Sequence, residues 1–396
     1  MDISNPLNKY RFVYENSKRI AYWDTIQGFL IFLVVMTHYL FAYRGIDPVK
    51  SFIELNLSFH MPVFVFVTGY FSKSERARGK EALIKLICAY LIFNFALMLF
   101  DFPRTRSTFR LTTPYYTYWY ILAMIAWRIM AERLSKIRFI MFFCVVVALL
   151  TGFIESINNT FALSRIFAFA PYFMAGFLFE RGKMEAFIQK RKAATQLFGV
   201  CIALMGIGAV AFMVVIGRLS TEILLMKSYT NLSDVVIRAM LMITSSLIII
   251  GILISFPRRP IPFFSAWGRN SLTIFLLHRF ATLIFLVIFS RYVSWPNKWV
   301  YLAAVVCAVV TTFVLGGNWL TRFLNQLLDS GAGLLLGNDS LDQQPKWTGI
   351  LLRTIAISLL LGTLVASIYP FVKKQPQPQL TGIAEQFNVS SIKFNG

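Results

Sequence analysis

Histidine, cysteine and charged residues are all scarce in this chain of 396 residues. Charged residues make up 14% of it, whereas a soluble domain carries about 25%, so the composition argues against an ordinary soluble protein. The polar N-terminus has no apolar run followed by small residues, so no cleavable signal peptide is expected. The cysteines form no CxxC pair and lie in apolar runs, so we predict buried small side chains without disulfides or a metal site, at Cys88, Cys144, Cys201 and Cys307.

What the chain has in abundance is apolar sequence. Hydrophobic residues make up 57% of it, and the mean hydropathy is +0.64. A spanning helix needs about 20 mainly apolar residues, and no internal repeat or glycine-rich nucleotide loop is visible. The sequence therefore predicts an all-α, polytopic integral-membrane helical bundle. Its expected spans lie near residues 20–43, 52–71, 82–101, 115–130, 139–155, 160–180, 194–217, 234–255, 263–290, 300–316 and 349–371.

The basic residues indicate an orientation. With the N-terminus in the cytoplasm, Lys and Arg are about twice as numerous on the cytoplasmic side, as the positive-inside rule requires. The formal net charge of +21 is thus mainly an orientation signal, and no nucleic-acid partner is expected. The same loops would attract anionic lipid or an anionic cytosolic substrate.

These spans divide the chain into five parts. We expect a cytoplasmic N-terminal segment (1–19), a transmembrane domain (20–316), a cytoplasmic loop with an interfacial helix broken by glycines (317–348), an extra transmembrane helix (349–371) and an extracytoplasmic, disordered tail (372–396).

All three histidines lie inside expected spans. At 1.5 Å per residue, His38 lies about 24 Å above the cytoplasmic end of its helix, His60 about 12 Å below the outer end of its own, and His278 about 24 Å up. Arg165 falls in the same outer half. Ionisable groups inside a membrane usually face the bundle interior and mark a functional path, so these four side chains could line one cavity.

Each histidine also has a structural interpretation. His38 is the best candidate for catalysis, because no proline kink lies next to it for its side chain to stabilise. Imidazole transfers protons near neutral pH. His60 precedes Met61 and Pro62, and the proline frees a carbonyl near Ser58, so His60 either holds this kink or takes part in catalysis. His278 either packs at the end of an apolar run or contacts substrate.

Five segments, in order, resemble the membrane acyltransferase 3 family, and most of all its sugar O-acetylase branch, similar to fucose acetylase. Residues 23–38, WDTIQGFLIFLVVMTH, resemble W-D-x-x-K-G-x-x-I-x-L-V-V-x-x-H, and residues 59–71, FHMPVFVFVTGYF, resemble F-H-M-P-x-F-x-F-x-S-G-Y-F. Residues 118–128, 164–176 and 268–278 are similar to W-F-L-L-x-L-x-x-W-R, S-R-x-x-x-F-x-P-F-F-x-x-G and G-K-N-S-L-x-I-Y-L-L-H. The first two matches together are specific, whereas either alone would be weak.

The resemblance implies a ten-helix acyltransferase core plus one additional C-terminal helix. It implies transfer of an acyl group, expected to be acetyl, from cytosolic acyl-CoA to a hydroxyl of an extracytoplasmic or lipid-linked glycan in a bacterial plasma membrane, without a metal. His38 would be the general base, and His60 or Arg165 would stabilise the oxyanion. The expected substrate-binding residues are Asp24, Gln27, Trp119, Asn270, Ser271 and His278.

One position departs from the family. Where relatives usually have Arg or Lys, linked to acyl-CoA handling, this chain has Gln27. Either Lys18, Arg19 or another cytoplasmic basic residue substitutes for the missing charge, or the activity is altered or lost. Asp24 would pair with a basic group or orient the donor; alternatively it is a boundary residue in water. Two other functions stay open: export of a polysaccharide or lipid-linked sugar, and a catalytically silent family member.

Overall fold

The structure is a computed structural model, and it describes residues 6–45, 47–105, 111–155, 157, 160–180, 182, 192–292, 298–336 and 346–372. Within these residues the regular structure is helical. The α-helices are α1 (Pro6–Leu40), α2 (Asp47–Phe71), α3 (Glu75–Arg78), α4 (Lys80–Thr105), α5 (Trp119–Ser135), α6 (Ile140–Leu150), α7 (Leu163–Leu178), α9 (Lys192–Val215), α10 (Thr221–Leu224), α11 (Ser233–Ser255), α12 (Pro262–Arg269), α13 (Ser271–Tyr292), α14 (Lys298–Leu315), α15 (Asn318–Leu336) and α16 (Lys346–Val372). Short 3₁₀ turns are η1 (Phe41–Tyr43), η2 (Tyr116–Tyr118), η3 (Thr151–Phe153) and η4 (Thr160–Ala162).

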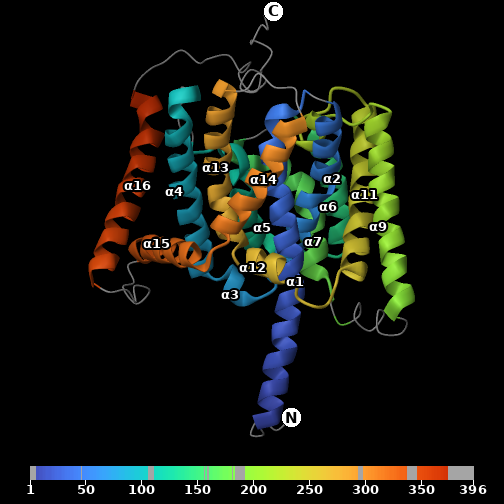
Figure 1. The fold of residues 1–396 in the computed structure, drawn as a ribbon, viewed down its shortest axis with the longest axis horizontal. Coiled ribbons are helices and arrows are strands. Elements are labelled where there is room, and N and C mark those ends of the chain that lie inside the picture. The colour runs from blue at the N-terminus through green and yellow to red at the C-terminus, as the bar shows by residue number, and fades with distance from the viewer. Residues whose placement is uncertain are drawn as a thin grey trace, which may run out of the picture.

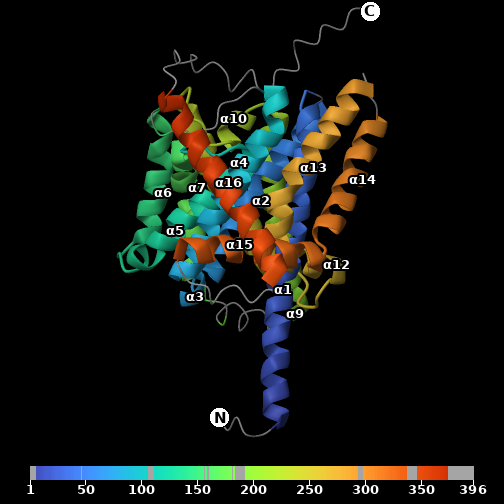
Figure 2. The same ribbon diagram turned by 90° about the vertical axis from the view of Figure 1, so that its left-hand side faces the viewer.

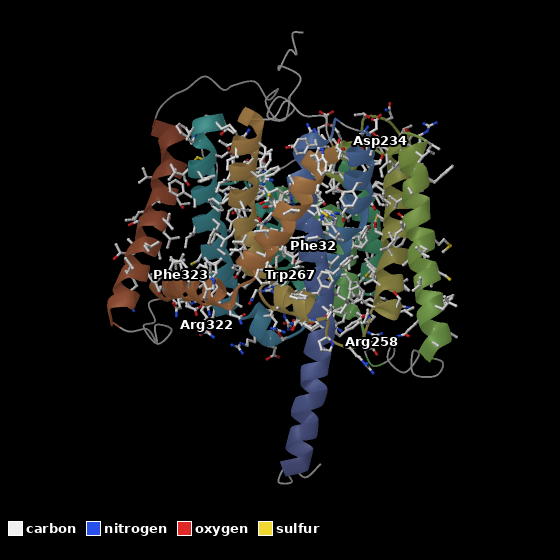
Figure 3. All side chains as sticks on the ribbon, in the orientation of Figure 1. Phe32, Asp234, Arg258, Trp267, Arg322 and Phe323 are labelled. Carbon is white, nitrogen blue, oxygen red and sulfur yellow. The ribbon has the colours of Figure 1, made fainter. Side chains whose placement is uncertain are left out.

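The long helices stand side by side and form a slab (Figures 1 and 2). The start of α1 projects from one side of it, which we call the N-terminal face. α11 crosses the slab, since Asp234 in its first turn lies near one face and Arg258, just after its end, lies near the other (Figure 3). In the described part of the chain, seven helices are long and apolar enough to cross a membrane, or eight if the bent pair α14 and α15 is one span. The prediction of an all-α polytopic membrane bundle is confirmed.

Each of the eleven expected spans holds helix, but three differ from expectation. α1 begins at Pro6, because no proline or glycine follows until Gly28 and nothing stops the helix at residue 20. The ninth span is two helices, α12 and α13, separated at Asn270. α6 has only 11 residues, continued by the short turn η3.

The expected interfacial helix is continuous rather than broken by glycines. α15 follows α14 after a bend of 62° and lies across the N-terminal face (Figure 1). Gly331 does not interrupt it, and a Cβ at this position would make ordinary van der Waals contact with Cys88 of α4. Residues 337–345 and the tail from residue 373 lie outside the described part.

The prediction for the cysteines was wrong at one position. Cys88 and Cys144 are buried and Cys307 is half-buried, but Cys201 is exposed. Cys201 lies on α9, which packs against α11 and α2 with one face and leaves the other on the outer surface of the bundle. All four are free thiols.

Among the helix crossings that bring backbones into direct contact, two involve the histidine-bearing helices α1 and α2. A Cβ built on Gly28 of α1 would lie 1.8 Å from the carbonyl oxygen of Phe264, and one on Gly268 of α12 would lie 1.8 Å from that of Asp24. The second crossing, of α2 with α7, repeats the arrangement: a Cβ on Gly69 would lie 2.0 Å from a backbone carbonyl oxygen of α7. Small residues at such crossings let helices in a membrane approach closely, where dispersion and polar contacts hold them.

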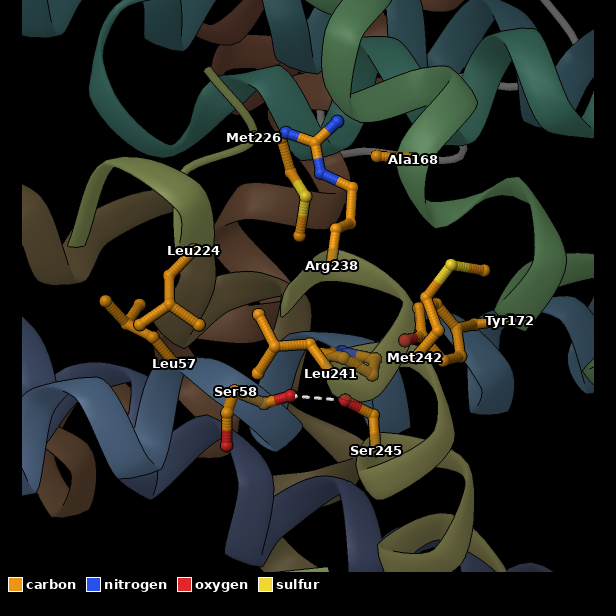
Figure 4. A pocket seen from close by; sticks show the side chains of 11 residues that line it. Leu57, Ser58, Ala168, Tyr172, Leu224, Met226, Arg238, Leu241, Met242 and Ser245 are labelled. Carbon is orange, nitrogen blue, oxygen red and sulfur yellow. Dashed lines mark hydrogen bonds between the residues drawn. The ribbon is translucent and has the colours of Figure 1, made fainter. Parts of the chain in front are cut away.

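Pro62 of α2 frees the backbone carbonyl of Ser58, as expected for a proline inside a helix. The hydroxyl of Ser245 on α11 donates to this carbonyl oxygen over 2.7 Å (Figure 4). A side chain of a neighbouring helix therefore supplies the hydrogen bond that this carbonyl loses to the proline. His60 instead donates from its ring to the carbonyl of Asn56, one turn earlier.

The α2–α7 crossing should not tolerate a methyl group. Gly69→Ala is expected to lose about 1–3 kcal/mol of stability, because the helices must separate or bend. The matched control is Gly208→Ala on α9, where a Cβ would meet nothing within 4 Å and where Ala favours helix by about 1 kcal/mol. Thermal unfolding of the purified proteins in detergent measures both. Equal melting temperatures for Gly69→Ala and the parent protein would contradict the crossing.

Candidate functional site

Two of the three histidines meet as a pair. The ring centres of His38 on α1 and His278 on α13 lie 5.2 Å apart, with the ring planes 35° from parallel. His60 on α2 lies near enough to interact electrostatically with His38, as does Arg279. The structure thus pairs His38 with His278 at one depth, but none of the four side chains expected to line one cavity, His38, His60, His278 and Arg165, is among the described residues that line the cavity reported below.

A buried amide joins α1 to α2 beside His38. The side-chain nitrogen of Asn56 donates to the hydroxyl of Thr37, which itself donates to the carbonyl of Leu33 over 2.8 Å. The same nitrogen lies 3.2 Å from the carbonyl oxygen of Leu33. Because the backbone carbonyl of Asn56 also accepts from His60, this one residue ties the positions of two histidines together.

Backbone carbonyls set the tautomers of His60 and His278. Nδ1 of His60 contacts the carbonyl oxygen of Asn56, and Nδ1 of His278 lies 2.8 Å from that of Phe275. A carbonyl oxygen only accepts, so Nδ1 carries the hydrogen in each ring and Nε2 keeps a lone pair in the neutral form. Nε2 of His278 is buried and has no hydrogen-bond partner among the described residues. The ring that carries this nitrogen lies beside the ring of His38.

Arg279, which follows His278, places a positive charge next to the histidine pair and was not among the predicted site residues. Its side chain is 5% exposed and its guanidinium lies 4.3 Å from the centre of the Tyr116 ring. Asp101 of α4, 3% exposed, accepts from Arg104 and from the hydroxyls of Tyr115 and Tyr116. A cation inside an apolar helix was a visible signal, but its approach to Tyr116 depends on the packing of the bundle.

Arg165 lies in a separate aromatic setting. Its guanidinium sits 5.1 Å from the centre of the Trp119 ring, and this ring stacks on Phe169 with centres 5.4 Å apart. A cation over the face of an indole is attracted by the ring quadrupole. The two predicted residues Arg165 and Trp119 are therefore in contact with each other, on α7 and α5.

A cavity of about 460 Å³ lies below the histidine pair, toward the N-terminal face. This volume is in the range of small-molecule sites, about 300–1,000 Å³. α1, α2, α4, α5, α13 and α15 form its walls. Phe275 lines it, and the centre of this ring lies 5.9 Å from that of His278. Phe275 thus touches both the cavity and the His278 ring, whereas no histidine is among the described residues that line the cavity.

The expected substrate-binding residues divide into two groups. Gln27 and Ser271 line the cavity. Asp24 does not lie in water: it is 6% exposed, at the crossing of α1 with α12, where Arg269 acts on it electrostatically. Asn270 donates to the carbonyl of Gly316 over 2.6 Å and so fixes the junction of α12 and α13 to the bend before α15.

Three charged cavity residues were missed as site residues: Lys85 on α4, Arg128 on α5 and Asp329 on α15. Lys85 and Arg128 served only as orientation signals, because a basic residue near a helix end is usual in any membrane protein. Within the described residues, no group of three or more His, Cys, Asp or Glu side chains could hold a metal ion.

Comparison with known proteins gives one family. Residues 20–317 match the acyltransferase domain of the acyltransferase 3 family, from the start of the first span to the bend before α15. No curated protein and no solved structure matches the chain. The match covers most of the chain, includes all three histidines, Arg165 and the greater part of the cavity wall, and shows that this protein is a membrane protein of the acyltransferase 3 family.

Proposed function

We propose that this protein is an O-acyltransferase that moves an acyl group, most simply acetyl, from cytosolic acyl-CoA to a hydroxyl of an extracytoplasmic or lipid-linked glycan. The observation that carries the proposal is the cavity whose lining residue Phe275 also lies against His278, the ring partner of His38. A thioester could enter it from the N-terminal face, while a hydroxyl approaches from the opposite side. The sugar O-acetylase likeness of the motifs supports acetyl and a glycan.

In this mechanism the acceptor hydroxyl oxygen attacks the thioester carbonyl carbon, and His38 takes the hydroxyl proton as the new C–O bond forms. When the tetrahedral intermediate collapses, the C–S bond breaks and the proton passes to the departing sulfur. Arg165 is better suited than His60 to stabilise the oxyanion, because a guanidinium always carries N–H donors whereas neutral His60 offers a lone pair at Nε2.

The proposal places the N-terminal face in the cytoplasm of a bacterial plasma membrane. The excess of Lys and Arg on that face supports this orientation, and the same charges would draw the phosphates of the donor toward the cavity.

Labelling at the C-terminal tail tests this orientation. A single cysteine at position 391, made by Ser391→Cys in a chain whose four native cysteines are replaced by alanine or serine, should react with a membrane-impermeant maleimide in intact cells. Labelling that requires lysis would contradict the orientation. A single cysteine on the other face, such as Ser135→Cys at the end of α5, should show the reverse pattern.

Removal of the proposed base should abolish transfer. His38→Ala is expected to lower the acylation rate by about 10²–10⁴-fold while the folded protein stays abundant. Mass spectrometry of surface glycans measures the outcome: cells with the parent protein should carry an acetyl-sized mass addition that His38→Ala cells lack. Cys201→Ala, at an exposed position on α9, is the control and should acylate normally. Normal acylation by His38→Ala would overturn the mechanism, and loss of the whole polymer would favour export.

Gln27 should tune donor binding. The helical rise puts it about 16 Å below His38, and it lines the cavity. Gln27→Arg is expected to tighten binding of acetyl-CoA or leave it unchanged, because it adds a charge facing phosphates. Calorimetric titration of the purified protein measures this, with Ser135→Arg as a control that adds the same charge outside the cavity. If neither the parent protein nor Gln27→Arg binds acetyl-CoA, the acyltransferase proposal falls.

A further inference from the structure

The matched acyltransferase domain ends at residue 317, yet the cavity wall does not. α15, which begins at Asn318, lies flat across the N-terminal face and packs against α4 and α16 (Figures 1 and 2). Its buried side, with Leu324 and Leu327, faces the bundle. Asn325 and Asp329 reach the cavity from the same helix. A segment outside the family domain therefore forms the cytoplasmic border of the proposed donor site.

The cavity carries two cations and one anion among its lining residues. Lys85 and Asp329 form an ion pair with 2.5 Å between Nζ and Oδ1, and each side chain is about one-third exposed. Arg128 donates from Nε to the hydroxyl of Ser72, 3.2 Å away, and has no carboxylate partner among the described residues. Without a ligand, one of the two cations is thus already held by α15, while the other remains available.

We propose that Lys85 and Arg128 bind the phosphates of an anionic thioester donor, and that Asp329 of α15 competes with those phosphates for Lys85. This rests on the proposed acyl-CoA donor and adds the residues that recognise it. Gln27 of α1 lacks the positive charge that relatives usually have at this position. In the proposal, Lys85 of α4 and Arg128 of α5 supply it from other walls of the same cavity.

The physical chemistry favours exchange of Asp329 for a phosphate. An ion pair this exposed is weak, because water screens it and both side chains lose freedom. A phosphate brings more negative charge than a carboxylate and offers several strong acceptor oxygens, and between Lys85 and Arg128 it would meet two cations instead of one. The released Asp329 remains at the cavity border and can return to water.

A purely structural role for the Lys85–Asp329 pair makes a different prediction. If the pair only fastened α15 to α4, its loss would loosen the helix and weaken binding whichever partner were changed. In the proposed competition, the two changes act in opposite directions. Asp329→Asn keeps the shape of the side chain, and Lys85→Gln keeps much of its length, so neither removes the apolar packing of α15 on α4.

The test is calorimetric titration of the purified full-length protein with coenzyme A, and separately with pantetheine, which has no phosphate. Asp329→Asn should tighten coenzyme A binding by about 3- to 10-fold, and Lys85→Gln should weaken it by about 10-fold, with Arg128→Gln acting in the same direction. Pantetheine binding should change in none of them. In the double variant, Asp329→Asn should have no further effect, because it acts through Lys85.

Glu222→Gln is the matched control, because it removes the carboxylate of another short ion pair, Lys227–Glu222 at 2.6 Å, outside the cavity. It should leave coenzyme A binding unchanged. If the parent protein binds coenzyme A and Asp329→Asn binds it equally or more weakly, the competition is overturned while the donor proposal stands. If no form of the protein binds coenzyme A, the donor proposal and this inference fall together.

Discussion

Direct contact between helix backbones is the constraint on which the site depends. At the crossing of α1 with α12, Gly28 and Gly268 leave no room for a side chain between the helices. That contact sets the depth of α1 against the α12–α13 unit, and so determines that His38 reaches the level of His278. The crossing of α2 with α7 sets Gly69 against α7 in the same way and places His60 relative to Arg165. A membrane bundle gains little from the hydrophobic effect between helices. Close backbone contacts therefore determine the relative positions of the helices that carry the histidines.

Polar contacts then orient the groups that the crossings bring together. Asn56 connects α1 to α2 through Thr37 and accepts from the His60 ring on its backbone carbonyl. The hydroxyl of Tyr118 donates to the carbonyl of Leu276, two residues before His278, over 2.7 Å. Backbone carbonyls therefore position the rings of His60 and His278, and among the described residues no carboxylate is paired with either ring. Within the membrane, orienting these rings by carbonyls rather than by carboxylates avoids the desolvation cost of an added charge.

Depth in the membrane could be predicted from the sequence, whereas position around the bundle could not. A helix rises by a fixed amount per residue, so counting was enough to put His38 and His278 at one level, and the structure confirms that they meet. The proline at position 62 likewise predicted a freed carbonyl, but not that Ser245 of α11 would satisfy it. Lys85, Arg128 and Asp329 share one cavity although they come from three distant segments. No local sequence pattern predicts that these three side chains line the same cavity. α15 was not predicted as one continuous helix because Gly331 favours a break locally, whereas the packing of the whole helix on α4 and α16 depends on the fold.

The shortness of α6 has a consequence for the lipid around the protein. With η3 it rises only about 22 Å, whereas the hydrocarbon core of a bilayer is about 30 Å thick. Its outward surface is nevertheless strongly apolar, with Phe142, Phe143 and Leu150 exposed. A hydrophobic surface shorter than the hydrocarbon core is commonly accommodated by local thinning of the bilayer. We therefore expect the bilayer to be thinner on this flank of the bundle, so that α6 is the side on which lipid chain length would act on the protein.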